Sequence, residues 1–293
     1  MELTEIHPGI LIAYYVLLAV FSFVFTNPYY MITFILMILL LIYLQGGKKD
    51  ILNQIKIFIP IGIFIVVLNF LFNYTGDNRI YIWGSYFITI EAVSYGFIMA
   101  GSFFLILLTL NSYNQMVSYQ EMLYILSKKF PIISMILVMA LRFIPLLEKR
   151  TVEVSNLMKL EEKDKTGENS KFDKLKERIK KVGNIMGVTV AWSLEEAMLT
   201  AKSMKARGYL SSKRTSYLKY TMNKADYCFI LLMAITLTVL IYGLIYGNGY
   251  ISIYPKMNFS WNDFPLNIYY FAFIVFLLPL IYLELEEVWI WHR

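Results

Sequence analysis

The segment Ala191–Tyr209 reads AWSLEEAMLTAKSMKARGY, and it lies within a charged insert of a chain that is otherwise strongly apolar. Ser193-x-x-Glu196 has the form of a capping box, in which each side chain satisfies a free amide at a helix start. Apolar residues then recur at helical spacing as far as Gly208, where a helix commonly ends because glycine adopts the left-handed conformation at little cost. The spacing predicts a helix of roughly 14 residues, about 21 Å long at 1.5 Å per residue.

The end of this predicted helix carries Ala206-Arg207-Gly208. A guanidinium between two residues of little bulk is able to enter a groove on another protein. Alternatively, Arg207 is a solvated charge placed favourably near a helix C-terminus. The tripeptide by itself is compatible with both interpretations.

The composition identifies a membrane protein. Of the 293 residues, 58% are hydrophobic and 16% are charged, whereas about 25% of the residues in a soluble domain are charged. The mean hydropathy is +0.56. The start of the chain is acidic and does not resemble a secretory signal. The single cysteine, Cys228, excludes an internal disulfide, and its place at the start of an apolar run favours a small buried side chain.

Six apolar stretches have the length that crosses a bilayer. We place them at about 10–26, 28–45, 57–72, 92–110, 227–246 and 264–283. Asn27-Pro28 suits the turn between the first two spans. The mixed, aromatic stretch 73–91 predicts an interfacial loop or short hairpin, and we expect Glu91, at the entrance of the fourth span, to be hydrated rather than to relay protons.

The apolar segment Pro131–Leu147 has basic residues on both flanks. Because such residues cluster on the cytoplasmic side of a span, a crossing helix would force one cluster outside. Arg142 would in addition cost about 2.5–3.5 kcal/mol at the bilayer centre. We therefore expect a helix that lies in or just under the membrane, with both ends facing the cytoplasm.

Residues 148–224 carry 18 of the 27 Lys and Arg and 10 of the 21 Asp and Glu, a net charge of +8 that leaves −2 for the rest of the chain. This asymmetry places the insert, and with it both termini, in the cytoplasm. The predicted fold class is all-α, a polytopic membrane protein with about six transmembrane helices and cytoplasmic amphipathic helices. The predicted domains are 1–112 with the N-terminal transmembrane helices, 113–225 with the cytoplasmic and interfacial helices, and 226–293 with a C-terminal transmembrane hairpin.

A further helix is predicted to begin at Ser170 and to run as far as Met186, with apolar residues at helical spacing and lysines on its other face. Such a helix is most often a solvated surface. It is also able to lie on an anionic membrane surface.

Motifs for catalysis, cofactor binding and metal ligation are missing from the sequence. There is no G-x-x-x-x-G-K-[ST] phosphate loop, and His7 and His292 stand near opposite ends of the chain. We expect no catalytic residue, no cofactor, no metal site and no nucleic-acid partner. A membrane enzyme would need clustered polar groups inside the spans, and a self-contained carrier would need inverted repeats and broken spans. Active transport would draw its energy from a partner.

A set of short motifs runs through the chain. They are Leu141-Arg142-Phe143-Ile144-Pro145, Glu196-Ala197, Ser203–Tyr209 and Arg214-Thr215, and in the N-terminal part His7-Pro8, Asn27-Pro28, Ile88–Glu91 and Tyr95-Gly96. Together they resemble the transmembrane T component of energy-coupling factor transporters, the EcfT family that includes CbiQ. The resemblance covers nearly the whole chain.

The resemblance implies a non-enzymatic scaffold in the cell membrane, surrounded by the lipid bilayer. In that family two cytoplasmic ABC ATPase subunits engage the amphipathic helices, which are then called coupling helices. A separate membrane protein, the S component, binds the vitamin or metal ion, such as cobalt, that is taken up.

Carried onto this chain, the resemblance makes Arg207 the residue inserted at an ATPase groove, with Ala206 and Gly208 giving clearance. Arg142 and Pro145 would lie at the start of the coupling region. The family usually has another such tip about fifteen residues after its proline. That region here contains Lys159-Leu160, a degenerate first coupling motif without arginine or glycine.

The topology is testable with single cysteines at Ser127 and Thr151 in a Cys228→Ser background. If Pro131–Leu147 does not cross the membrane, both cysteines stay unlabelled when an impermeant thiol reagent is added outside intact cells. Labelling of either position would show that the segment crosses.

Overall fold

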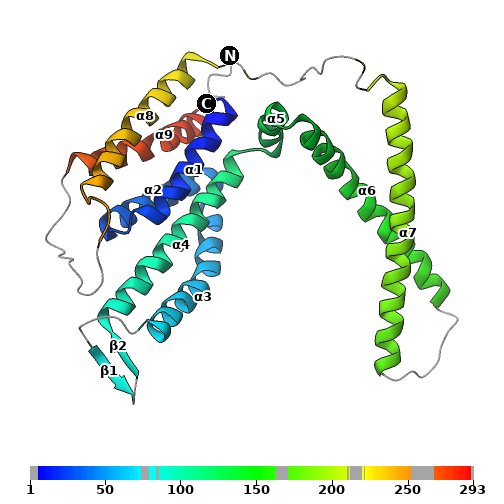
Figure 1. The fold of residues 1–293 in the computed structure, drawn as a ribbon, viewed down its shortest axis with the longest axis horizontal. Coiled ribbons are helices and arrows are strands. Elements are labelled where there is room, and N and C mark those ends of the chain that lie inside the picture. The colour runs from blue at the N-terminus through cyan, green and yellow to red at the C-terminus, as the bar shows by residue number, and fades with distance from the viewer. Residues whose placement is uncertain are drawn as a thin grey trace. The chain divides into compact units, whose positions relative to one another are not determined.

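The computed structural model describes residues 6–73, 79–83, 86–162, 171–209, 211, 220, 222–251 and 267–291. In these residues the chain forms nine α-helices and a two-stranded hairpin (Figure 1). The elements are α1 (Pro8–Val24), α2 (Pro28–Gly46), α3 (Lys48–Phe72), β1 (Arg79–Trp83), β2 (Tyr86–Thr89), α4 (Ile90–Met116), α5 (Tyr119–Lys129), α6 (Pro131–Glu162), α7 (Lys171–Ala206), α8 (Lys224–Ile245) and α9 (Ile268–Trp291).

The chain divides into two compact units. Met1–Met122 and Tyr220–Arg293 form one of them, the bundle unit, which contains α1 to α4, α8 and α9. Leu123–Lys219 forms the other, the insert unit, which contains most of α5 together with α6 and α7.

Six helices among the described residues are long and apolar enough to cross a membrane. They are α2, α3, α4, α8, α9 as far as Glu286, and α6 as far as Leu157. The first predicted span corresponds to α1, which has 17 residues and is shorter than these six helices. The protein is therefore a multi-pass membrane protein, and whether Pro131–Leu147 crosses stays a prediction.

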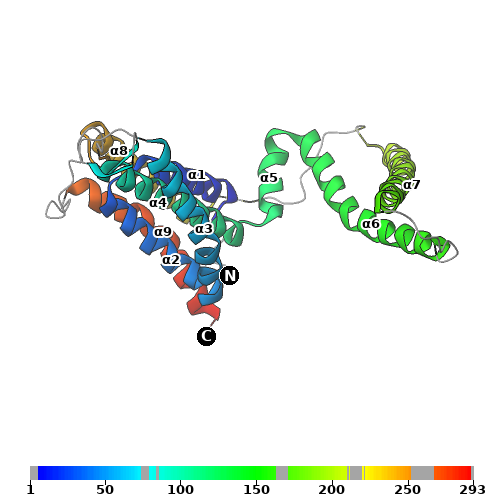
Figure 2. The same cartoon turned by 90° about the horizontal axis from the view of Figure 1, so that it is seen from below.

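Aromatic side chains form the centre of the bundle unit. Figure 2 shows the helices of this unit packed side by side. Tyr14 of α1 stacks on Phe276 of α9 with ring centroids 4.8 Å apart, and its hydroxyl donates to the Phe276 carbonyl. The rings of Tyr30 in α2 and Phe273 in α9 have their centroids 5.3 Å apart. Because lipid tails are as apolar as these rings, close packing rather than water exclusion holds such helices together.

Polar contacts show which helix ends meet. The backbone amide of His7, before α1, donates to Asp226 in the first turn of α8 at 3.0 Å. Tyr15 of α1 bonds Ser112 near the end of α4 at 2.8 Å. Glu286, near the end of α9, lines a groove with residues that precede α1 and α8. The starts of α1 and α8 and the ends of α4 and α9 therefore lie at one end of the bundle unit.

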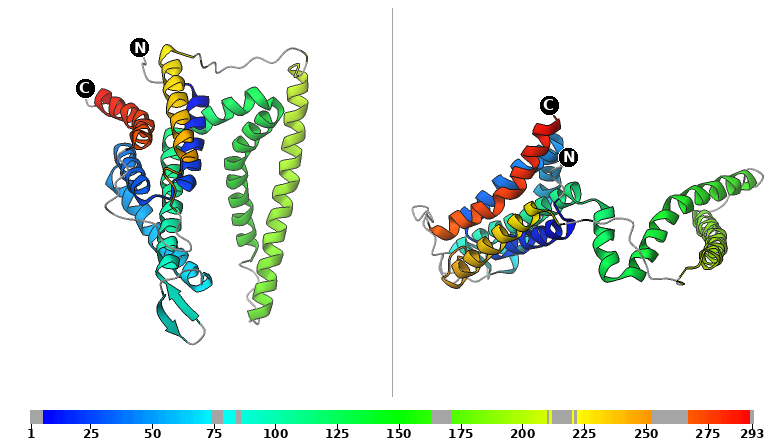
Figure 3. Two further views of the ribbon diagram at one scale, coloured as in Figure 1. Left: turned by 60° about the vertical axis from the view of Figure 1, so that its left-hand side comes forward. Right: turned by 90° about the horizontal axis from the view of Figure 1, so that it is seen from above.

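The predicted turn and hairpin are confirmed. Asn27 caps α2 by accepting the Tyr29 amide at 3.1 Å, and Pro28 is the first residue of α2. β1 pairs with β2 in antiparallel fashion between α3 and α4, as the left view of Figure 3 shows.

Two predictions about single side chains are wrong. Glu91 is fully buried rather than hydrated. It lies in the first turn of α4, whose N-terminus favours a carboxylate. Cys228 is exposed on α8 rather than buried, because it lines an open groove between α8 and α9.

The helices of the insert unit are longer than predicted. α6 does not end near Leu147 but continues through Pro145 to Glu162. Thr151 bonds the Leu147 carbonyl at 2.7 Å, one turn beyond the proline. Proline removes one helix hydrogen bond, which bends a helix more often than it ends one when both flanks favour helix.

The predicted capping box at Ser193 is wrong. α7 is one helix of 36 residues, and Ser193 lies inside it with its hydroxyl bonded to the Val190 carbonyl at 2.8 Å. The residues before Ser193 are themselves helical, so their carbonyls pair with the amides that a capping box would satisfy. The two predicted helices of the insert are thus parts of α7, and the predicted cap Ser170 lies outside the described residues.

A capping box that the sequence analysis missed stands at α5. The Ser118 amide donates to the Glu121 carboxylate at 2.9 Å, and the Glu121 amide lies 3.4 Å from the Ser118 hydroxyl. The pattern Ser-x-x-Glu would have predicted this helix start.

The packing of α3 on α4 is testable at two glycines of α4. A methyl group at Gly96 would lie 3.2 Å from the Val66 Cα of α3, whereas at Gly101 it would meet the flexible end of Met31. Both changes to alanine gain the same helix propensity, about 1 kcal/mol. At Gly96 a rigid backbone contact opposes this gain with a cost of about 1–3 kcal/mol.

We therefore expect Gly96→Ala to lower the thermal unfolding midpoint of the purified protein in detergent relative to Gly101→Ala. Equal midpoints for the two variants would show that α3 and α4 do not approach closely at Gly96.

Candidate functional site

The end of α7 is closed by a Schellman motif. Gly208 has a φ of +77°, its amide donates to the Lys205 carbonyl at 3.1 Å, and the Tyr209 amide donates to the Met204 carbonyl at 3.1 Å. Met204 and Tyr209 also line one apolar groove, which is the hydrophobic contact that accompanies this motif. The predicted role of Gly208 as the residue after the helix end is confirmed.

This geometry presents Arg207 at the tip of α7. The Arg207 amide makes the last helical bond, to the Ser203 carbonyl at 3.1 Å. Ala206, Arg207 and Gly208 are all exposed. Within the described part of the chain, the structure shows no ion pair or hydrogen bond of the Arg207 guanidinium. A fixed positive charge is therefore held on a rigid backbone and remains open to a partner.

The Leu141–Pro145 motif lies on α6 beside this tip. Phe143, in the middle of the motif, lines the same groove as Met204 and Tyr209. Arg142 and Pro145 are exposed. The fold thus brings together two motifs that are about sixty residues apart in the sequence.

The groove between the two helices has a volume of about 490 Å³. Its walls are mainly apolar and rich in methionine, formed by Met135, Met139 and Phe143 of α6 and by Ala197, Thr200, Ala201, Met204, Lys205 and Tyr209 in and after α7. α6 and α7 therefore do not pack tightly at the end that carries Arg207.

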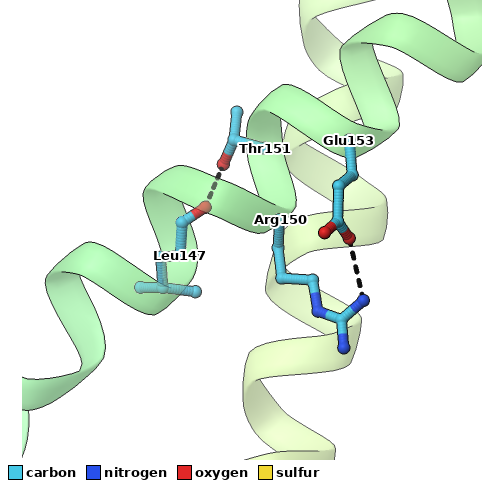
Figure 4. Close-up of polar contacts among 4 residues, drawn as sticks. All are labelled: Leu147, Arg150, Thr151 and Glu153. Carbon is cyan, nitrogen blue, oxygen red and sulfur yellow. Dashed lines mark hydrogen bonds and ion pairs between the residues drawn. The ribbon is translucent and has the colours of Figure 1, made fainter.

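A cationic contact joins the helices farther along. The Arg150 guanidinium of α6 lies 5.0 Å from the centre of the Trp192 ring of α7. The same guanidinium pairs with Glu153 at 2.8 Å (Figure 4). In the sequence Arg150 is one of the basic residues that flank Pro131–Leu147, and neither helix taken singly contains a signal for the contact.

The order of these contacts shows that α6 and α7 run in opposite directions where they cross (Figure 1). Moving along α6 from Phe143 to Arg150 corresponds to moving back along α7 from the groove to Trp192. Lys159 lies nine residues beyond Arg150, and Arg207 lies fifteen residues beyond Trp192. The two predicted tips therefore stand at opposite ends of the helix pair, with about 36 Å of helix between them, measured along the two axes at 1.5 Å per residue.

Lys159 and Leu160 belong to the last turn of α6. Their side chains lie outside the described residues. The structure thus places the degenerate first motif at a helix end, as it does Arg207, but does not bring the two motifs together.

A metal centre is not formed by the described residues, in which no three His, Cys, Asp or Glu side chains come together. The His7 Nδ1 accepts the Gly9 amide at 3.1 Å at the start of α1, and the ring lies edge-on to Tyr220 with ring centroids 6.3 Å apart.

Comparison with models of protein families identifies a match. A family model described as CbiQ, cobalt transport protein, matches residues 3–217. The search of curated proteins finds no match. The matched segment includes α1 to α4, the Leu141–Pro145 motif and the tip of α7. Because it covers more than half of the 293 residues, the chain belongs to the CbiQ family of cobalt transport proteins, membrane components of transporters.

Proposed function

We propose that this protein is the T component of an ATP-driven energy-coupling factor importer. It would bind two cytoplasmic ABC ATPase subunits and couple their motion to a separate S component that binds a vitamin or metal ion. The observation that carries the proposal is the exposed Arg207, fixed at the tip of α7 by the Schellman motif. Membership of a cobalt transport family supports a role in transport.

The chemistry of the tip suits a protein partner. Arg207 presents a planar guanidinium, whose donors match a carboxylate or several carbonyl oxygens in a groove. Gly208 at φ +77° turns the chain sharply and adds no side chain next to the arginine. The motif at Leu141–Pro145 would form the neighbouring part of the same contact.

The positions of the two tips suit two ATPase subunits. Arg207 and Lys159 stand at opposite ends of the α6–α7 pair, so each would meet a different subunit. At the first tip, Lys159 would provide a point charge without the bidentate geometry of arginine. The two contacts would therefore differ in strength.

A cytoplasmic location of the insert follows from its charge. Residues 148–224 carry a net charge of +8, and basic segments stay on the cytoplasmic side. The start of α1 and the end of α9 lie at the same end of the bundle unit as the end of α4, which leads into the insert, so both termini would also be cytoplasmic.

An uncovered face of α7 is a candidate surface for the S component. A Cβ at Gly183 or Gly187 would meet no atom within 4 Å in the described part of the chain. Between and before them, Met186 and Ile179 are 64% and 65% exposed. Small residues four apart let two helix backbones approach closely. A membrane helix of the S component would fit this face.

Arg207→Ala tests the proposed ATPase contact. If Arg207 is buried against an ATPase groove, its truncation costs about 2–5 kcal/mol of association free energy. That is a loss of affinity of about 30-fold to several thousand-fold. Arg207→Lys should recover only part of it. The measurement is the affinity of the purified protein for its ATPase subunits.

Lys202→Ala is the matched control, since it removes an exposed positive charge from the same helix one turn earlier. It should bind the ATPases like the wild type. Normal membrane levels of every variant are required. Wild-type affinity of Arg207→Ala would return Arg207 to the role of a solvated charge.

The backbone at Gly208 is tested separately by a pair of variants. Asparagine adopts the left-handed conformation more readily than other residues with a side chain, so Gly208→Asn should keep most of the affinity. Gly208→Val places a β-branched residue at φ +77°, at a cost of about 1–3 kcal/mol. We expect it to bind the ATPases about 5- to 150-fold more weakly. Equal affinities of the two variants would mean that the tip does not need its left-handed turn.

A further inference from the structure

The packing between α6 and α7 differs along their length. At the end that carries Arg207 they are separated by the groove of about 490 Å³. Beyond this groove the Arg150 guanidinium packs on Trp192, 5.0 Å from the ring centre. Rotation of one helix on the other is therefore resisted at Arg150 and little resisted at the tip.

The Arg150 side chain is aimed at α7 by its own helix. Glu153 lies one turn later on α6 and pairs with the guanidinium at 2.8 Å (Figure 4). This pair fixes the plane of the guanidinium, and an arginine stacks on an aromatic ring better than a lysine does. Both charged side chains are about half exposed, so the contact is weak enough to be remade during a working cycle.

α6 contains a proline just before this contact. Pro145, five residues earlier, has no amide to donate to the Leu141 carbonyl, so one helix hydrogen bond is missing there. Prolines are the usual sites of helix bending. Arg150 thus contacts α7 five residues beyond the point where α6 lacks a hydrogen bond.

We propose that Arg150 is a positioning residue, the pivot at which α6 and α7 cross. Held by Glu153 against Trp192, it sets the angle between the helices and with it the separation of the two tips, Lys159 and Arg207. Its effect on transport rests on the proposed function, because the tips would be the ATPase contacts. Its effect on the geometry of the helix pair does not.

Distance measurement between two spin labels tests the pivot. The labels are placed at exposed positions on either side of the crossing, Leu157 of α6 and Lys202 of α7, in the full chain with Cys228→Ser in lipid nanodiscs. About 25 Å of helix lies between these positions, measured along the two axes through the crossing at 1.5 Å per residue. We expect one narrow distance distribution in the parent protein.

Removal of either partner should loosen the crossing in the same way. Arg150→Ala and Trp192→Leu should each broaden the distribution and shift its mean, and the double variant should add little, because both break one contact. Arg150→Lys should be intermediate. Lys149→Ala removes the neighbouring exposed charge and should leave the distribution unchanged. Parent-like distributions in both Arg150→Ala and Trp192→Leu would overturn the proposal.

Transport supplies a second readout, in liposomes that contain the ATPases and the S component. Arg150→Ala should still bind the ATPases through Arg207 but should take up less substrate per ATP hydrolysed. Unchanged coupling together with a broadened distribution would show that the pivot does not serve transport. Failure of ATPase binding in the parent protein would refute the proposed function and leave the distance test standing.

Discussion

The carboxylate of Asp226 joins two parts of the chain on which the bundle depends. One oxygen accepts the amide of His7, 219 residues away, and the other accepts the amide of Asn223 at 2.8 Å. Amides at helix starts have no partner within their helix, and a carboxylate there is favoured by the helix dipole. Only 1% of Asp226 is exposed. Asp226 thereby holds the starts of α1 and α8 together.

How much of this structure the sequence predicts depends on what surrounds each residue. The spans in the bundle were predicted because helices facing lipid must be apolar along their whole length. The end of α7 was predicted because only local backbone geometry decides it, at Gly208. The start of α7 was not predicted correctly, since Ser193-x-x-Glu196 is a capping-box pattern that lies inside a continuing helix. Arg150 on Trp192 depends on how two helices cross, and neither helix by itself encodes that.

The candidate site combines two kinds of order. Around Arg207 the backbone is fixed by hydrogen bonds of the Schellman motif, and the side chain is exposed. Behind it, Met135, Met139 and Met204 line a groove that the chain leaves unfilled. Methionine side chains adapt their shape to what they contact. The backbone that carries Arg207 is thus fixed, whereas the methionine side chains between α6 and α7 can adapt.

The uninterrupted length of α7 has a mechanical consequence. Trp192 lies 21 residues after the start of this helix and 14 residues before its end, which divides it into arms of about 32 Å and 21 Å. A straight rod that turns about Trp192 moves its longer arm about one and a half times as far as the shorter one. A small displacement imposed on Arg207 would arrive enlarged at the far end of α7. One glycine or proline bend between the two arms would absorb that movement, whereas Gly183 and Gly187 lie within an unbroken helix.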